Sequence, residues 1–85
     1  MIVSDREIEI AFLGTNFGTT EYRKLLEVSV LKKLVDYHCG HTITYIMQGL
    51  DLIGKTGKVT KKGKLFVREA YHEFMIGAED EQKEI

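Results

Sequence analysis

The chain has 85 residues, of which 44% are apolar and 29% are charged, and its formal net charge is −1. A chain of this length forms one small domain, and this composition is typical of a soluble globular protein rather than a disordered or fibrous one. No apolar run approaches the roughly 18 residues of a membrane-spanning helix, so no membrane partner is expected. The single cysteine, Cys39, excludes an internal disulfide and fits a reducing, cytoplasmic location.

The charged residues are distributed unevenly along the chain. Six basic residues and no acidic residue lie between Leu52 and Arg68, whereas the last seven residues, EDEQKEI, contain four acidic residues and one lysine. A compact cationic segment without local acidic partners favours an anion-binding surface, although solvated surface lysines give the same pattern. We therefore expect a folded domain over 1–76 and an acidic, flexible C-terminal tail over 77–85.

Two helices are predicted in the first half of the chain. A short helix over 5–13 follows Ser4, which is a favoured N-cap residue. A long amphipathic helix over 20–38 follows, with Thr19 or Thr20 as its N-cap and with Cys39-Gly40 at its end. The glycine-rich stretch between them predicts a turn.

A third, shorter helix is predicted over 42–50, with Thr42 as its N-cap. Gly49 lies in its last turn and weakens it, so the helix is expected to end near residue 50. Its apolar residues recur at i, i+3, i+4 and i+7, which places them on one face: Ile43, Ile46, Met47 and Leu50.

A small β-hairpin is predicted over 52–60, because two short segments with the β-branched residues Ile53 and Val59 flank a glycine-containing turn. Thr60 then caps a last helix over 61–76. The buried stripe of this helix is predicted to contain Phe66, Val67, Ala70, Tyr71 and Phe74.

The stretch GLDLIGKT, residues 49–56, matches the phosphate-loop pattern G-x-x-x-x-G-K-[ST]. That loop works only between a buried strand and a helix N-terminus, where backbone N–H groups point at the phosphates. Here large apolar residues and Asp51 fill the space between the glycines, and no helical pattern follows Thr56 directly. We interpret the match as accidental and expect no nucleotide cofactor.

The stretch HCGH supplies three residue types that bind zinc: His38, Cys39 and His41. A structural zinc site needs four ligands, usually as two separated pairs, and His72 is the only further histidine. Cys39 is therefore expected to be a small buried residue, and no orienting group for covalent catalysis is apparent. We expect no metal and no enzymatic activity.

The order of the predicted elements suggests a family. A helix, a tight glycine-containing turn and a second short helix form the helix-turn-helix signature, and a basic hairpin after them is typical of a wing. The sequence resembles the winged helix-turn-helix family over roughly 31–71, although it lacks a separate short helix before 42–50. Its small size and acidic tail are also similar to those of phage and prophage accessory proteins. The residues that match the family pattern are Leu52, Ile53, Gly54, Gly57, Thr60, Lys62 and Gly63.

This resemblance implies a mainly α-helical single domain with a small β-hairpin wing that binds duplex DNA as a small transcriptional regulator. The helix 42–50 would then read bases, and the basic segment 52–64 would contact phosphates. Lys61 and Lys62 oppose the dipole of the helix that they begin, which suggests that they serve phosphate binding instead. Base-contact candidates are Thr42, Thr44, Tyr45 and Gln48, and phosphate-contact candidates are Lys55, Lys58, Lys61, Lys62 and Lys64.

The base-contact candidates include no arginine or lysine, which make the commonest specific contact with guanine. This leaves open an alternative in which the same surface binds a protein, as in a phage-encoded inhibitor or adaptor that acts on a host protein. A homodimer through the helix 5–13 or through the closing helix is a further expectation, because helix-turn-helix proteins often pair to bind two half-sites.

Overall fold

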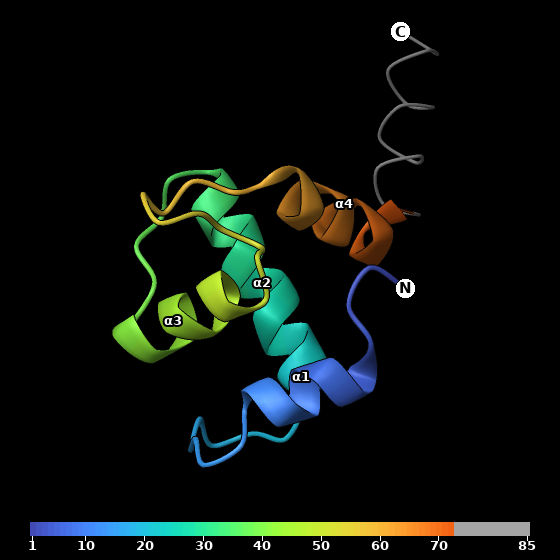
Figure 1. Cartoon of the computed structure of the whole chain (residues 1–85), viewed down its shortest axis with the longest axis vertical. Helices are drawn as coiled ribbons and strands as arrows, with labels where there is room; N and C mark the ends of the chain where they lie inside the picture. Colours follow the sequence, from blue (N-terminus) through green and yellow to red (C-terminus); the bar gives the residue numbers. More distant parts are fainter. Residues whose placement is uncertain (73–85) are drawn as a thin grey trace, which may run out of the picture.

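The structure, a computed structural model, describes residues 1–72, which form four helices around one core (Figure 1). The helices are α1 (Asp5–Ala11), α2 (Tyr22–Leu34), α3 (His41–Gly49) and α4 (Lys61–Ala70). The longest helix, α2, packs against each of the other three. None of these four helices is both long enough and apolar enough to cross a membrane. The mainly helical fold is confirmed, whereas the predicted tail 77–85 lies outside the described residues.

The core is built from apolar side chains of all four helices and of the segments that join them. Phe12 stacks on Tyr22 with ring centroids 4.7 Å apart and meets Phe17 edge-on at 5.5 Å, so three aromatic rings hold the loop between α1 and α2. The largest fully buried side chains are Phe12, Phe66, Ile8, Leu26, Met47, Leu52, Ile53, Val3, Val30 and Val67.

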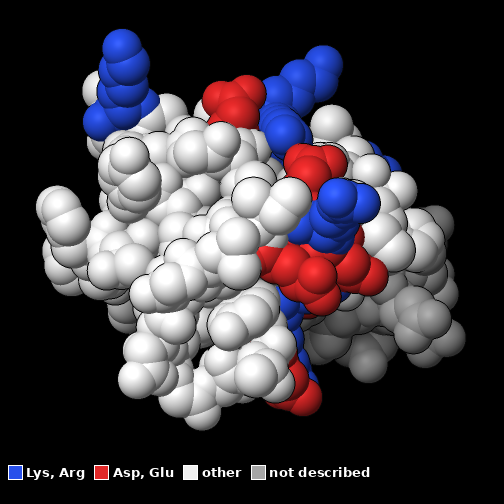
Figure 2. Space-filling model, turned by 60° about the horizontal axis from the view of Figure 1, so that its bottom comes forward, with Lys and Arg blue, Asp and Glu red and all other residues white. Residues whose placement is uncertain are grey.

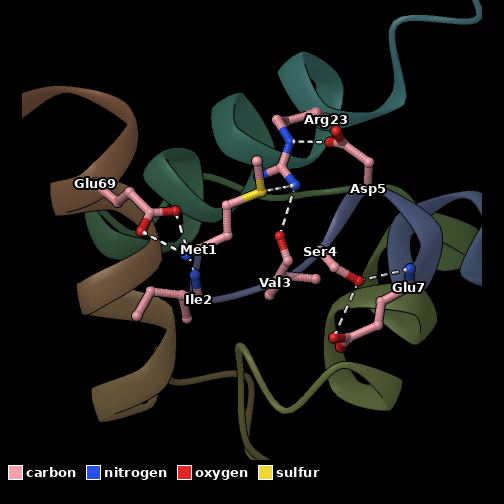
Figure 3. Close-up of polar contacts among 8 residues, drawn as sticks. All are labelled: Met1, Ile2, Val3, Ser4, Asp5, Glu7, Arg23 and Glu69. Atoms are coloured by element: carbon pink, nitrogen blue, oxygen red, sulfur yellow. Dashed lines mark hydrogen bonds and ion pairs between the residues drawn. The ribbon is translucent and has the colours of Figure 1, made fainter.

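The N-terminal segment is fixed by polar contacts with α2 and α4 (Figure 3). Arg23 of α2 donates from Nε to the Asp5 carboxylate (2.7 Å) and from Nη2 to the Val3 carbonyl (2.6 Å). The predicted N-cap of α1 is confirmed, because Ser4 Oγ accepts a hydrogen bond from the Glu7 N–H (3.2 Å). These contacts hold buried Val3 against the core.

The long helix α2 is shorter at both ends than the sequence predicted. Its N-cap is Glu21, without a side-chain hydrogen bond, rather than Thr19 or Thr20. At its other end Asp36 adopts a left-handed conformation (φ 64°), and its N–H donates to the Lys33 carbonyl (3.2 Å). This motif stops the helix before the predicted Cys39-Gly40, because a left-handed residue cannot continue a right-handed helix.

The short helix α3 begins one residue before the prediction. Gly40 is its N-cap, so the prediction of Thr42 in that role is wrong, and Thr42 lies inside the first turn. At its end Asp51 is left-handed (φ 61°), and the Leu52 N–H donates to the Met47 carbonyl (2.9 Å). Both Leu52 and Met47 are fully buried, which is the apolar contact that usually accompanies such a cap.

The predicted β-hairpin over 52–60 is not present, and residues 1–72 contain no strand. One isolated antiparallel bridge joins Ile53 to Val59, with a turn between them. The ladder cannot grow, because Leu52 completes the cap of α3 on one side and Thr60 begins α4 on the other. The basic segment is therefore a tight loop between two helices rather than a wing with strands.

The predicted N-cap of the last helix is confirmed, because Thr60 Oγ1 accepts from the Gly63 N–H (3.0 Å). Phe66 and Val67 are buried as predicted, Ala70 and Tyr71 are partly buried, and Phe74 lies outside the described residues. Gly63 is buried where α4 approaches the exit of α3. A Cβ atom there would clash with the Leu52 carbonyl oxygen and lie 2.7 Å from Val59 Cγ1.

We expect Gly63→Ala to lower the free energy of unfolding by about 1–3 kcal/mol, because the added methyl group has no space beside the Leu52 carbonyl. Gly49→Ala is the matched control, since a Cβ at that helical position meets nothing within 4 Å. The control should leave stability unchanged or raise it by up to about 1 kcal/mol through helix propensity. Urea denaturation followed by circular dichroism measures both, and equal stabilities of the two variants would contradict the packing.

Burial raises the pKa of the Glu27 carboxyl where α2 meets α4; nearby Arg23 partly offsets this rise and Glu69 adds to it. Burial also raises the pKa of Tyr71, and the charge of Glu27 contributes. Because the folded pKa of Glu27 lies above that of the unfolded chain, its contribution favours folding at low pH. That contribution is lost as the pH rises through the folded pKa.

We therefore expect Glu27→Gln to gain stability relative to the unmodified chain as the pH rises from about 4 to about 7. Glu9→Gln, at an exposed glutamate of α1, removes the same charge elsewhere and should show no such gain. Thermal denaturation at several pH values makes the comparison, and parallel pH profiles of all three proteins would contradict the assignment.

Candidate nucleic-acid interface

The loop between α3 and α4 has a buried base and an exposed cationic tip. Leu52 and Ile53 are buried, and the Gly54 N–H donates to the Lys58 carbonyl (2.8 Å) across the turn. Gly57 has a positive φ of 85°, which favours glycine at this corner. Lys55 and Lys58 are therefore exposed on a loop whose backbone is fixed from below.

Thr60 joins this loop to both neighbouring helices. Its hydroxyl donates to the Asp51 carbonyl (2.6 Å) while it accepts from the Gly63 N–H, and its own N–H donates to the Leu52 carbonyl (3.1 Å). One side chain thus satisfies backbone groups at the end of α3 and at the start of α4. This connection sets the position of the lysines on either side of it.

The remaining phosphate-contact candidates lie on the first turn of α4. Lys61 and Lys64 are exposed, and Lys62 is partly buried. Within residues 1–72 none of the five candidate lysines forms an ion pair. Their charges therefore have no acidic partner among the described side chains.

Lys33 of α2 also lies at this loop, although its sequence pattern did not predict a place in the site. Its Nζ would lie 3.4 Å from a Cβ at Gly57, so its ammonium group lies against the loop that carries Lys55 and Lys58. Its helical spacing indicates only that Lys33 is not in the core. Tertiary packing decides which loop covers that side of α2. No signal in the sequence therefore predicts that Lys33 lies beside the α3–α4 loop.

The base-contact candidates lie on two different flanks of α3. Gln48 lies next to the loop, because its Nε2 donates to the Gly54 carbonyl (3.4 Å). The Thr44 hydroxyl donates to the Gly40 carbonyl (2.8 Å) within α3 and is thus already engaged. Thr42 and Tyr45 are exposed, and Tyr45 lies on the flank that faces α1.

Figure 2, which turns the lower side of Figure 1 forward, shows a broad area without charged side chains beside a band of mixed charge. Two stretches of the chain, 10–20 and 37–50, contain no Asp, Glu, Lys or Arg. They meet at a groove of about 390 Å³ between α1 and α3. The groove is lined by Glu7, Ile10, Ala11, Tyr45, Ile46, Gly49 and Leu50.

The HCGH residues do not converge. Cys39 is buried, and its thiol donates to the Ser29 carbonyl (3.5 Å), whereas His38 and His41 are exposed. Residues 1–72 contain no group of three or more His, Cys, Asp or Glu side chains that could hold a metal ion. The arrangement of Cys39 is that of a core residue at the entry to α3.

The phosphate-loop match GLDLIGKT begins at the last residue of α3 and continues into the loop, and the next helix begins only at Lys61. Leu52 and Ile53 are buried in the core. The stretch therefore has neither a preceding strand nor a helix N-terminus where nucleotide phosphates would need them.

Comparison of the chain with protein-family models, with curated proteins and with solved structures gives no match.

We expect Thr60→Ala to lower the free energy of unfolding by about 1–2 kcal/mol, because it removes the N-cap of α4 and the bond to Asp51 together. Thr60→Ser keeps a hydroxyl in the same place and should lose much less. Urea denaturation compares the two variants, and an equal loss in both would show that the methyl group of Thr60 matters more than its hydroxyl.

Proposed function

We propose that this chain binds duplex DNA as a small regulator, with α3 against the base edges and the lysines of the α3–α4 loop on the phosphates. The observation that carries the proposal is the attachment of the cationic loop to α3. Gln48 contacts the loop at Gly54, and Lys33 of α2 contacts it at Gly57. Cations that have no acidic partner among residues 1–72 therefore lie beside one flank of an exposed helix. Phosphate contacts lie in the same way beside a helix in the major groove.

The division of roles follows from the side chains. The lysines contact phosphates on any DNA sequence, so they do not distinguish one base from another. Gln48 can form two hydrogen bonds with adenine once its hydrogen bond to the Gly54 carbonyl is broken. Because α3 contains no Lys or Arg and the Thr44 hydroxyl is engaged within the helix, base readout rests on few groups. The proposed binding is therefore dominated by phosphate contacts and depends strongly on salt.

We expect Lys55→Ala combined with Lys58→Ala to weaken binding to all duplex sequences alike. The slope of log K against log salt should become shallower by about 2, because two phosphate contacts are lost. Arg6→Ala combined with Lys24→Ala is the matched control, since it removes two exposed cations from α1 and α2. Fluorescence anisotropy with labelled duplexes over a salt series measures all three proteins.

In the same assay, Gln48→Ala should weaken binding to a selected site by about 1–3 kcal/mol and barely change binding to random duplex. Equal losses in the loop variant and in its control would show that only net charge matters. If the unmodified chain does not bind duplex at about 50 mM salt, where even non-specific contacts are strong, the DNA proposal is refuted.

A second candidate function is protein binding, for example as a phage-encoded inhibitor or adaptor acting on a host protein. The uncharged area of Figure 2 and the groove between α1 and α3 favour it. Exposed apolar side chains such as Ile10 and Tyr45 beside a groove are typical of protein-binding sites rather than of DNA-binding ones. This function uses the α1-facing flank of α3, whereas DNA binding uses the flank next to the loop.

A further inference from the structure

We infer that the groove between α1 and α3 is a self-association surface, at which two copies of this chain pair about a two-fold axis. Of the residues that line the groove, Ile46 is buried and Ala11 and Leu50 are partly buried, so these three form its floor. At its rim Ile10 is 58% exposed and Tyr45 is 75% exposed. An apolar hollow thus lies beside two projecting apolar side chains on one small area.

This combination of hollow and projection makes the surface complementary to itself. In a two-fold contact the same patch serves both partners, so Tyr45 of one copy can enter the groove of the other while the reciprocal contact forms. The groove, about 390 Å³, has room for an aromatic side chain. A tyrosine suits this position because its ring is apolar and its hydroxyl can stay in water at the edge.

The charge distribution favours a second copy as the occupant. Stretches 10–20 and 37–50 contain no Asp, Glu, Lys or Arg, so two copies meet there with little repulsion between like charges. Of the residues that line the groove only Glu7 is charged, and its carboxylate accepts a hydrogen bond from Ser4 Oγ (3.2 Å). Pairing through the two cationic loops would instead place Lys55 and Lys58 of one copy against the same lysines of the other.

Self-association of this kind does not rest on DNA binding. It covers Tyr45 and Gly49 on one flank of α3 and leaves Gln48 and the cationic loop on the other flank. A variant that separates the copies should therefore keep its phosphate contacts. Failure of the pairing and failure of the DNA proposal are thus distinguishable.

The test is sedimentation equilibrium of the full chain. Its average mass should rise from the monomer value of 9.7 kDa towards twice that value as the concentration increases into the micromolar to millimolar range, where small interfaces associate. Ile10→Lys, which places a charge in the contact, should weaken association at least tenfold. Tyr45→Ala should also weaken it, because it removes the inserted ring.

Two controls replace exposed apolar residues outside the groove: Tyr37→Ala, at a side chain 67% exposed, and Leu65→Lys on α4. Both should associate like the unmodified chain, and circular dichroism should show the same helix content in every variant. Amide NMR shifts that change with concentration should map to α1 and α3. A monomer at all concentrations, or a dimer insensitive to both Ile10→Lys and Tyr45→Ala, would overturn the inference.

Discussion

The close approach of α4 to the exit of α3 is the constraint on which the rest of the molecule depends. Residues 50–60 connect the two helices, and within this connection the Leu52 carbonyl lies against Gly63 of α4. Thr60 bridges the two helix ends, so the loop is short, its base is buried and its lysines are exposed. A side chain at Gly63 would separate the helices and release the loop.

This constraint also gives α3 two unlike flanks. One flank contacts the cationic loop through Gln48, and the other meets α1 at the mainly apolar groove beside Tyr45. The physics of the two flanks differs. Phosphate binding by lysines gains free energy mainly from counterion release, whereas apolar contact gains it from the removal of surface from water. A single nine-residue helix thereby presents two surfaces suited to different partners.

The sequence predicted correctly those features of the fold that depend on residues close together in the chain. The N-cap roles of Ser4 and Thr60 and the burial of Phe66 and Val67 follow from local pattern, and the structure confirms them. The end of α2 was misplaced, because the left-handed Asp36 gives no signal comparable to glycine. The prediction of a hairpin was wrong for a related reason. Its outer residues, Leu52 and Thr60, take part in the cap of α3 and in the cap of α4. The position of Lys33 and the α1–α3 groove depend on long-range packing, which periodicity cannot show.

Tyr45 connects the two proposed surfaces, because it is a base-contact candidate and also the projecting side chain at the groove. Where copies are paired through the groove, Tyr45 is covered and base contact rests on Gln48 and Thr42. Salt then acts on the two contacts in different ways, since it weakens phosphate binding steeply but leaves the burial of apolar surface nearly unchanged. Rising ionic strength therefore weakens the phosphate contacts of the loop, whereas pairing through the groove persists.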